Sequence, residues 1–377
     1  MDTTVAVQIC KEYEFTSVYE SIMKLFELAP PPDVKGKTVL VKPNILLPKK
    51  PEAAVCTHPV VVGAVVKAFV NAGAAHVLVG ESPAVANTTM AAKICGIYNQ
   101  VIDNGGEWVE FNEETEVFCP EAKLCHTFNF AKHFEKADLV VSVAKLKSHQ
   151  LMSYTGAMKN LFGLIVGLKK AQQHYRFPDK EDFAKYLTDL NLAAKAEYAI
   201  MDGIVGMDGP GGPGNGRPIP VGFLASSTNI LALDCVCSSA AGYNPLEVPN
   251  LRDALERNVW LKSTDEIKMA GCTAEEIFCK DFKAVHEKFA AKTLGKMIPP
   301  FINSLAKIIL VRNPHFNNKK CIRCGKCVQI CPAKVLDFSI NKNNPDKKQV
   351  IINRKNCIHC YCCHEVCPVE AISLRHF

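Results

Sequence analysis

Eight of the eighteen cysteines fall into two copies of one spacing, C-x2-C-x2-C-x3-C-P, near the C-terminal end of the sequence. The first copy is Cys321, Cys324, Cys327, Cys331 and Pro332, and the second is Cys357, Cys360, Cys363, Cys367 and Pro368. This spacing is typical of loops that hold cubane iron–sulfur clusters, because a thiolate at every third residue lets one tight loop present three sulfurs to one cube. The sequence therefore predicts two [4Fe-4S] clusters and a protein that handles electrons.

The predicted ligand sets are crossed, because the fourth cysteine of each run ligates the cluster of the other run. One cluster is expected on Cys321, Cys324, Cys327 and Cys367, and the second on Cys357, Cys360, Cys363 and Cys331. Zinc ribbons also use C-x2-C pairs, but a four-ligand zinc site gives no reason for a third cysteine at the same interval or for the proline. Cys362 interrupts the second run, and we interpret it as a spare thiol, with a ligand swap with Cys363 as the alternative.

Composition limits the class of protein. The chain has 377 residues, of which 48% are hydrophobic, so it can bury at least one large core. The sequence contains no uncharged apolar run of about 18 residues, so we predict no membrane-spanning helix. The first residues, MDTTVAVQIC, lack the basic and apolar regions of an export signal, so we expect a cytoplasmic location without disulfides. Oxygen-sensitive clusters and eighteen cysteines favour an anaerobic or microaerophilic host.

The net charge of +6 is unevenly distributed along the chain. Residues 317–356 carry ten Lys and Arg residues against two acidic ones, a local charge of +8 that leaves −2 for the rest. A cationic surface around the clusters would attract an acidic redox partner protein, such as a small ferredoxin or flavodoxin. The alternative is that these lysine and arginine residues only keep a small domain solvated and bind no partner. We do not expect nucleic acid as a partner, because no aromatic residues interleave the basic ones as a stacking platform.

The first 240 residues alternate short β-branched runs with helical patterns, which predicts an α/β fold with a mostly parallel sheet and flanking helices. Strands are predicted at residues 5–10, 38–41, 76–79, 138–144, 198–201 and 220–226, and helices at 17–28, 59–72, 180–195 and 231–241. A further helix is predicted to begin after Thr155. Residues 203–216 hold seven glycines and are predicted to form a loop.

Polar residues follow the predicted strands at the edge where parallel sheets bind ligands. They are Lys42, Asn44, Glu81, Lys145, Lys147, His149 and Asp202, joined by Lys159, Asn160 and Asp208 from nearby segments. The lysines and the glycine-rich loop predict a site for a small anionic ligand, with His149 or Lys147 as proton donor. Taken singly, each of these residues could instead be a solvated loop residue. No NAD, ATP or flavin motif is visible, so we predict none of these cofactors.

Six pieces of the sequence, in order, resemble the family called domain of unknown function 362. They are VLVKPNIL (39–46), THP (57–59), GES (80–82), AKLKSH (144–149), TGAMKNLFG (155–163) and the Asp202-Gly203 pair before the glycine-rich loop. Family members are commonly fused to a two-cluster bacterial ferredoxin module, which the resemblance also implies here. The polar positions of this sequence that match the family's motifs are Lys42, Asn44, His58, Glu81, Lys145, Lys147, His149, Lys159, Asn160 and Asp202. The resemblance thereby adds His58 to the site candidates. The resemblance implies no particular substrate.

Three regions are predicted from these patterns: an α/β domain over 1–290, a linker or docking helix over 291–314, and a small α+β dicluster ferredoxin domain over 315–377. Two hypotheses follow. In the first, the chain is an iron–sulfur oxidoreductase whose clusters relay low-potential electrons to or from a ligand site in the α/β domain. In the second, it is a non-enzymatic electron carrier or adaptor, and the α/β domain is a scaffold that docks on a partner redox complex.

Overall fold

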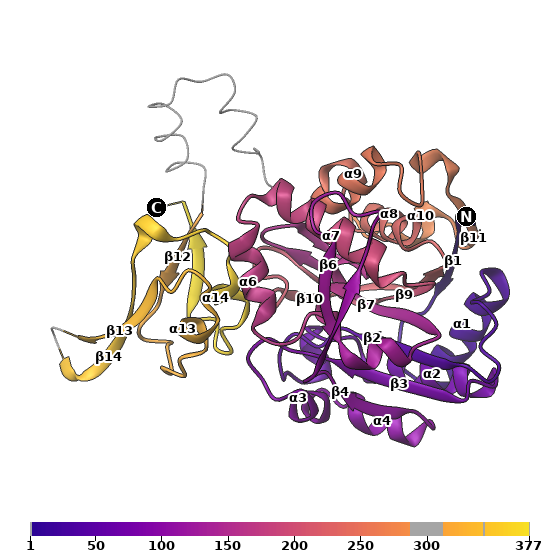
Figure 1. Cartoon of the computed structure of the whole chain (residues 1–377), viewed down its shortest axis with the longest axis horizontal. Helices are drawn as coiled ribbons and strands as arrows, with labels where there is room; N and C mark the ends of the chain where they lie inside the picture. The colour runs from indigo at the N-terminus through magenta and orange to yellow at the C-terminus, as the bar shows by residue number, and fades with distance from the viewer. Residues whose placement is uncertain (1, 287–311, 342–343, 377) are drawn as a thin grey trace.

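The computed structural model describes residues 2–286, 312–341 and 344–376. Residues 2–286, here called the α/β domain, are built around a single nine-stranded sheet. Residues 312–376, here called the C-terminal domain, lie beside one end of it (Figure 1). The predicted fold class, a mostly parallel α/β sheet with flanking helices plus a small C-terminal domain, is confirmed.

The large sheet has the strand order β11-β1-β10-β9-β7-β2-β3-β4, with β8 paired to β7 outside this path. The strands are β1 (Thr4–Ile9), β2 (Thr38–Pro43), β3 (His76–Glu81), β4 (Glu107–Glu110), β7 (Leu139–His149), β8 (Ser153–Thr155), β9 (Tyr198–Asp208), β10 (Arg217–Ser227) and β11 (Lys268–Gly271). Parallel pairs run from β9 through β7, β2 and β3 to β4, so the carboxyl ends of these five strands lie at one edge. β10 is antiparallel to both of its neighbours.

Helices cover both faces of the sheet because successive strand residues point to opposite sides. Val39 and Val41 of β2 pack in one core cluster, whereas Leu40 packs in the other. The first face is covered by α1 (Phe15–Leu28), α2 (Pro59–Asn71), α3 (Thr88–Ile94) and α4 (Ile97–Asp103). The second is covered by α5 (Ala157–Asn160), α7 (Lys180–Ala194), α8 (Ile230–Ala240), α9 (Pro249–Glu256) and α10 (Ala274–Ile277).

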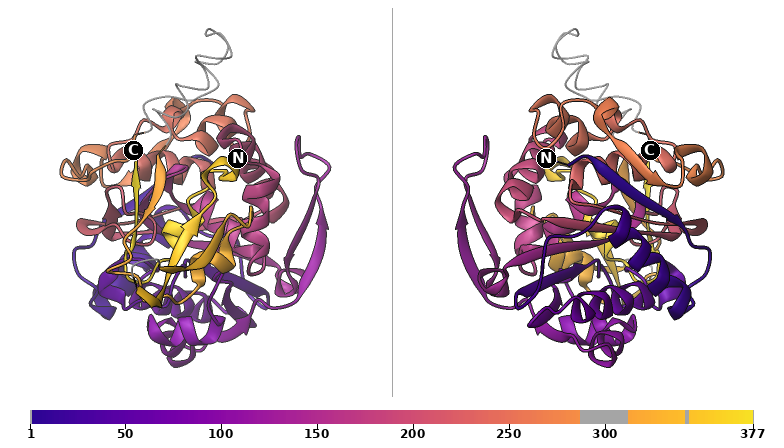
Figure 2. Two further views of the ribbon diagram at one scale, coloured as in Figure 1. Left: turned by 90° about the vertical axis from the view of Figure 1, so that its left-hand side faces the viewer. Right: turned by 90° about the vertical axis from the view of Figure 1, so that its right-hand side faces the viewer.

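Two further features lie at the edges of this domain. The hairpin of β5 (Glu114–Phe118) and β6 (Thr127–Ala131) stands away from the body as an arm (Figure 2). Helix α6 (Lys169–Arg176) lies on the side that faces the C-terminal domain (Figure 1). None of the helices in the described ranges is long and apolar enough to cross a membrane.

Two sequence predictions were wrong in detail. The long helix predicted after Thr155 is divided into α5, a 3-10 turn at Leu161–Leu164 and α6. At the break, a Cβ on Gly163 would lie 2.2 Å from the Glu81 carboxylate, so glycine is required where the chain passes the end of β3. The predicted loop at 203–216 begins only after Asp208, because β9 extends to that residue. Gly203 pairs with Phe223 of β10, and glycine is required there because a Cβ would lie 2.9 Å from the Phe223 ring.

The C-terminal domain consists of two small antiparallel sheets and two short helices. They are β12 (Asn313–Phe316) with β15 (Ile372–Arg375), β13 (Leu336–Asn341) with β14 (Asn344–Ile352), and α13 (Lys326–Ile330) and α14 (Cys362–Glu365). Ile330, Cys362 and Val366 are buried in the same core cluster as α1 and α2. The C-terminal domain is therefore packed onto the α/β domain. Most of the predicted linker, 291–314, lies outside the described residues, so its boundaries stay a prediction.

Candidate functional site

The cysteines of the two runs line two separate cavities in the C-terminal domain. One is lined by Cys321, Cys324, Cys327 and Cys367. The other is lined by Cys331, Cys357, Cys360 and Cys363, with Cys362 also at its wall. Each cavity thus contains three cysteines of one run and the fourth cysteine of the other. This lining is compatible with the predicted crossed ligand sets, which stay a prediction.

The remaining walls of both cavities are largely apolar. Phe338, Val350 and Ile372 line the first cavity, and Leu336 and Ile352 the second. Four convergent thiols inside an apolar shell fit a cubane cluster, whose ligands are cysteine thiolates and whose potential depends on burial. The donor sets present in this chain therefore fit the two predicted clusters.

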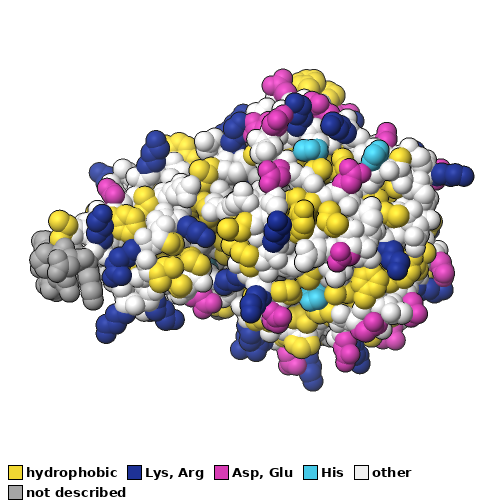
Figure 3. Space-filling view, turned by 90° about the horizontal axis from the view of Figure 1, so that it is seen from below, with side chains coloured by type: hydrophobic (Ala, Val, Ile, Leu, Met, Phe, Trp, Pro, Cys, Tyr) yellow, Lys and Arg dark blue, Asp and Glu magenta, His cyan; other side chains and the backbone are white. Residues whose placement is uncertain are grey.

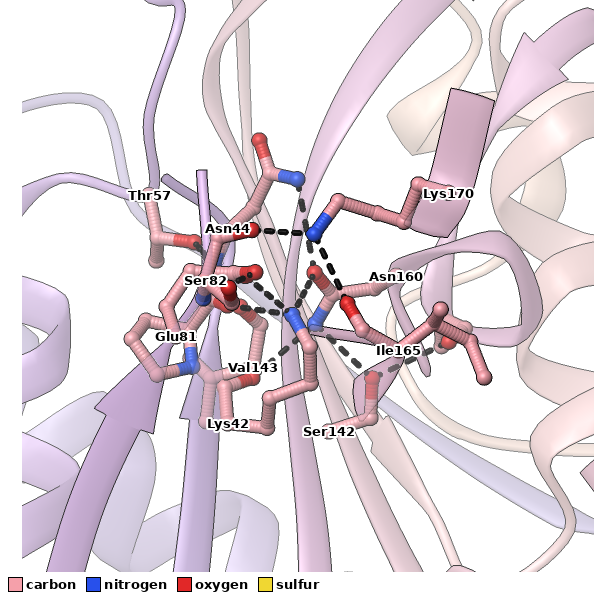
Figure 4. A network of polar contacts seen from close by, with 12 residues as sticks. Lys42, Asn44, Thr57, Glu81, Ser82, Ser142, Val143, Asn160, Ile165 and Lys170 are labelled. Atoms are coloured by element: carbon pink, nitrogen blue, oxygen red, sulfur yellow. Dashed lines mark hydrogen bonds and ion pairs between the residues drawn. The ribbon is translucent and has the colours of Figure 1, made fainter. Parts of the chain in front are cut away.

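Lys42, at the end of β2, is the centre of a buried polar network (Figure 4). Its Nζ donates to the Glu81 carboxylate, to the carbonyl of Pro43 at 2.9 Å and to Asn160 Oδ1 at 3.1 Å. Asn160 returns a hydrogen bond from Nδ2 to the carbonyl of Lys42 at 2.9 Å. Burial lowers the pKa of Lys42, while the charge of Glu81 opposes this effect. The network ties β2, β3 and α5 together and leaves the ammonium no free donor for a ligand.

A second buried network joins β7 and β9. Lys145 Nζ lies 2.8 Å from Asp202 Oδ2 and 2.8 Å from the hydroxyl of Tyr13, which itself donates to Asp202 Oδ1 at 2.9 Å. The backbone N–H of His58 donates to Asp202 Oδ2 at 2.9 Å, and the His58 ring stacks on Tyr13 with centroids 3.5 Å apart. Burial lowers the pKa of His58 to about 4. These residues form a closed ion-pair network that fixes the strand ends.

Lys147 differs from these two lysines because its hydrogen-bond partners are neutral. Its Nζ donates to Asn44 Oδ1 at 2.7 Å and to the carbonyl of Val55 at 2.8 Å. Its side chain is buried. Burial lowers the pKa of Lys147 to about 7. This ammonium therefore exchanges its proton near neutral pH, which suits a proton donor.

His149, at the end of β7, reaches across to the C-terminal domain. Its Nδ1 accepts hydrogen bonds from the backbone N–H groups of Leu151 at 3.0 Å and Met152 at 3.2 Å, so the neutral ring carries its proton on Nε2. Nε2 lies 3.3 Å from Glu365 Oε1 of α14. Among the described residues that oxygen has no well-aligned hydrogen-bond donor, so the two groups lie close together without such a bond. Burial lowers the pKa of His149 and raises that of Glu365.

Unsatisfied polar groups gather between α5, α6 and α14. Lys159 of α5 is half-buried, and within the described ranges its ammonium has neither a hydrogen bond nor an ion pair. Burial lowers the pKa of Lys159, and the charge of Glu365 opposes this effect. His174 of α6 and His364 of α14 are buried, and in the part of the chain that the structure describes each leaves Nδ1 without a partner. Burial lowers the pKa of both rings, to about 3 and about 4, so both are neutral at pH 7.

The glycine-rich loop contacts the C-terminal domain directly. Asn215 Nδ2 donates to the carbonyls of His364 at 3.2 Å and Cys367 at 3.3 Å. A Cβ on Gly214 would lie 2.4 Å from the carbonyl oxygen of Glu365, so only glycine allows this approach. Asp208, before the loop, accepts from Arg217 Nη2 at 2.7 Å and from the N–H of Lys283 at 2.9 Å. Its carboxylate is therefore committed to local structure.

The structure thus divides the predicted site residues into three groups and one separate residue. Lys42, Glu81, Asn160 and Asn44 form one network, which Lys147 joins through Asn44. His58, Lys145 and Asp202 form a second, His149 and Lys159 lie toward Glu365 of α14, and Asp208 lies apart. Sequence reasoning missed Tyr13, His174 and Glu365. Glu365 could have been noticed as the one acid within the second cysteine run, whereas nothing near Tyr13 or His174 in the sequence marks them.

The fold and the cysteine-lined cavities define an α/β protein that carries an iron–sulfur electron-transfer module. The chain belongs to the DUF362 family, a domain of unknown function, whose model matches residues 39–239. A model described as a 4Fe-4S dicluster domain matches residues 320–371. The predicted fusion is therefore confirmed.

Individual proteins that are similar to this chain have low sequence identity to it. The thylakoid-associated protein sll1697 of Synechocystis sp. is 31% identical over 217 residues, which are 57% of this chain and 66% of that protein. Among solved structures, the lactate racemase apoprotein of Thermoanaerobacterium thermosaccharolyticum has 12% identity and a TM-score of 0.41, over 64% of this chain and 57% of that one. A Thermotoga maritima protein has 13% identity and a TM-score of 0.33, over 53% of this chain and 52% of that one. At these levels the solved structures indicate nothing about activity.

The depressed pKa of Lys147 predicts a pH-dependent stability. Its pKa is about 7 when folded against an ordinary value of 10.5, so between these values the unfolded chain binds more protons. Stability from this group therefore rises with pH from about 7 to about 10.5. We expect wild type to gain stability relative to Lys147→Met over that window, as measured by urea unfolding at a series of pH values. A constant difference between the two proteins would contradict the shifted pKa.

Proposed function

We propose that this chain is an iron–sulfur oxidoreductase in which the C-terminal domain exchanges electrons with a small anionic ligand bound beside α14. The observation that carries the proposal is the 3.3 Å approach of His149 Nε2 to Glu365 Oε1. It links the edge of the sheet where the ligand would bind to α14, which lies within the second cysteine run. A fused arrangement of this kind removes the need for a diffusing electron donor to dock at each turnover.

We assign Cys321, Cys324, Cys327 and Cys367 to one [4Fe-4S] cluster and Cys357, Cys360, Cys363 and Cys331 to the other. Bound clusters of this type would supply single electrons at low potential. The cavity of the second set is the nearer to the α/β domain, because Cys362 on its wall is buried in the core cluster that includes β2 and α2. Electrons would enter or leave the ligand through that side.

The ligand chemistry follows from which donors are free. Lys42 and Lys145 already have carboxylate partners, whereas the Lys159 ammonium has no partner within the described ranges. An anion beside Lys159 would also accept from the neutral rings of His174 and His364, whose Nδ1 atoms lack partners. His149 would hold a proton at Nε2 toward the same space, and Lys147 would exchange a proton near neutral pH. A carboxylate or phosphate group fits this set of donors.

Ligand-induced changes at the clusters test this proposal. Protein purified without oxygen would be titrated with small carboxylates and with inorganic phosphate, while the electron paramagnetic resonance spectrum and the potential of the reduced clusters are followed. We expect a saturable change with wild type that is lost in Lys159→Met. Lys132→Met is the matched control, because Lys132 is exposed on the β5–β6 side and paired with Glu113.

A saturable change that persists in Lys159→Met would place the ligand elsewhere. If no anion changes the clusters and the protein exchanges electrons rapidly with an acidic protein, the oxidoreductase proposal is wrong. The second candidate function, an electron carrier or adaptor, would then take its place.

That second candidate, an electron carrier or adaptor, is favoured by the basic surface of the C-terminal domain. On the face seen in Figure 3, Lys and Arg side chains are scattered over this domain among hydrophobic and uncharged ones. The exposed ones are Lys319, Lys320, Arg323, Lys334, Lys348, Arg354 and Lys355. Such a surface fits an acidic redox partner such as a ferredoxin or flavodoxin. Electron exchange with an acidic ferredoxin that slows steeply with salt would support it, and a rate independent of salt would contradict it.

We also propose a cytoplasmic location.

A further inference from the structure

The two cysteine-lined cavities differ in how open they are to solvent. Of the eight cysteines in the two runs, Cys324 is the exposed one, and it lines the same cavity as Cys321, Cys327 and Cys367. This cavity is here called the Cys324 cavity. Cys362, on the wall of the other cavity, is buried in the core cluster that includes β2 and α2. The Cys324 cavity is therefore the one that a second protein can approach from solvent.

The hairpin of β13 and β14 forms one side of the opening of the Cys324 cavity. Phe338 and Val350 are paired across the hairpin, and both line the cavity. Successive strand residues point to opposite faces, so Ile340 and Lys348, the next pair on the same face, extend this surface beyond the cavity. Ile340 is 67% exposed, and Lys348 is exposed. The hairpin lies at the end of the C-terminal domain away from the α/β domain (Figure 1).

The first cysteine loop forms the other side of this opening. Ile322 is 60% exposed and lines the Cys324 cavity beside Arg323. The Arg323 guanidinium donates from Nε to the carbonyl of Lys348 at 2.7 Å and from Nη1 to the carbonyl of Cys321 at 3.2 Å. These two hydrogen bonds hold the loop against β14. The joined surface, here called the cluster rim, consists of Ile322, Arg323, Cys324, Ile340 and Lys348.

The cluster rim has the composition of a transient protein interface. Its two exposed isoleucines supply an apolar centre, which such interfaces surround with polar residues. Arg323 and Lys348 supply positive charge, and the exposed Lys319 and Lys320 come just before the first cysteine. Among the described residues, no Asp or Glu lines the Cys324 cavity. Positive charge of this kind attracts an acidic protein and speeds its encounter with the rim.

We propose that the cluster rim is the surface on which a small acidic one-electron carrier protein docks and exchanges electrons with this chain. The inference rests on the iron–sulfur clusters of the proposed function and does not require an anion beside Lys159. A reduced carrier loses one electron and this chain gains one, and no bond forms or breaks. Electrons then enter on the Cys324 side and move toward the other cavity, which is nearer to the α/β domain.

Electron transfer from a reduced acidic ferredoxin to the intact, cluster-loaded protein tests this inference. The reaction would be followed by stopped-flow absorbance without oxygen. The double variant Ile340→Ser with Lys348→Glu should lower the second-order rate constant at low salt by about tenfold or more. The matched control is Lys355→Glu, which makes the same change of charge at an exposed residue near Cys357 of the other cavity. It should change the rate constant by at most about twofold.

Iron content and reduction by dithionite distinguish a lost docking surface from a lost cluster. The variants should keep about eight irons per chain and should be reduced by dithionite as wild type is. If wild type itself lacks four-iron clusters, both this inference and the proposed function are wrong. If dithionite reduces the clusters but the double variant reacts with ferredoxin as fast as wild type, only the docking surface is wrong.

Cross-linking of wild type gives an answer that depends on no variant. A carbodiimide joins lysines to carboxylates that are in contact with them. We expect links from the ferredoxin to Lys348, Lys319 or Lys320, whereas links only to lysines of other surfaces, such as Lys355, would overturn the inference. Binding to vesicles of phosphatidylcholine and phosphatidylglycerol that the double variant loses, with electron transfer unchanged, would also overturn it, because the cluster rim would then contact a membrane.

Discussion

Asp202→Ala should lower the free energy of unfolding by about 3–5 kcal/mol, because it leaves the Lys145 ammonium buried without a counter-charge. Both side chains are at most 1% exposed, and their ion pair is 2.8 Å long. The change also removes the acceptor for the hydroxyl of Tyr13 and for the N–H of His58. Urea unfolding followed by tryptophan fluorescence would measure the loss, since both tryptophans, Trp108 and Trp260, lie in the α/β domain.

Two controls distinguish a buried charge from a general loss of contacts. Lys24→Ala breaks an exposed ion pair with Glu27 on α1 and should change the stability by at most about 1 kcal/mol. The double change Lys145→Met with Asp202→Leu removes both charges and should recover part of the loss, because apolar replacements of a buried pair are often tolerated. If the double variant is less stable than Asp202→Ala by a further few kcal/mol, the uncompensated charge is not the main cause.

The positions of β2, β3 and β7 along the chain could be anticipated because their β-branched runs are bounded by polar residues. β2, β3 and β7 appear where the sequence places them, and the fold class follows from their alternation with helices. The ends of β9 and α5 could not be anticipated. Glycine is locally typical of a loop, but Gly203 pairs with Phe223 of β10, whose ring occupies the space that a side chain at residue 203 would need. That reason lies in a neighbouring strand and not in the local pattern.

The location of the candidate site could be predicted because residues that follow parallel strands must lie at one edge of the sheet. What the sequence does not reveal is which of its lysines are paired. Lys42 and Lys159 look equivalent in a motif, yet one is neutralised by Glu81 and the other has no partner within the described ranges. The role of Glu365 was also hidden, because it depends on how the C-terminal domain packs against His149. Contacts between distant segments decide these points.

Removing Cys331 and Cys357 together should leave one complete [4Fe-4S] cluster, so the iron content should fall from about eight to about four per chain. Both residues line the same cavity, although they belong to different cysteine runs. Removing Cys327 and Cys331 together should instead damage both clusters, because these two neighbours in one run line different cavities. Iron analysis and electron paramagnetic resonance of alanine variants purified without oxygen would distinguish the two results.

An uncrossed arrangement, with each run holding its own cluster, makes the opposite prediction for the same two variants. Cys327→Ala with Cys331→Ala would then keep one complete cluster, and Cys331→Ala with Cys357→Ala would keep none. Cys363 is avoided in this design because Cys362, its neighbour, lines the same cavity and could replace it as a ligand. Cys235→Ala, which removes a buried cysteine of α8 far outside both runs in the sequence, should keep the full iron content and is the control for nonspecific loss.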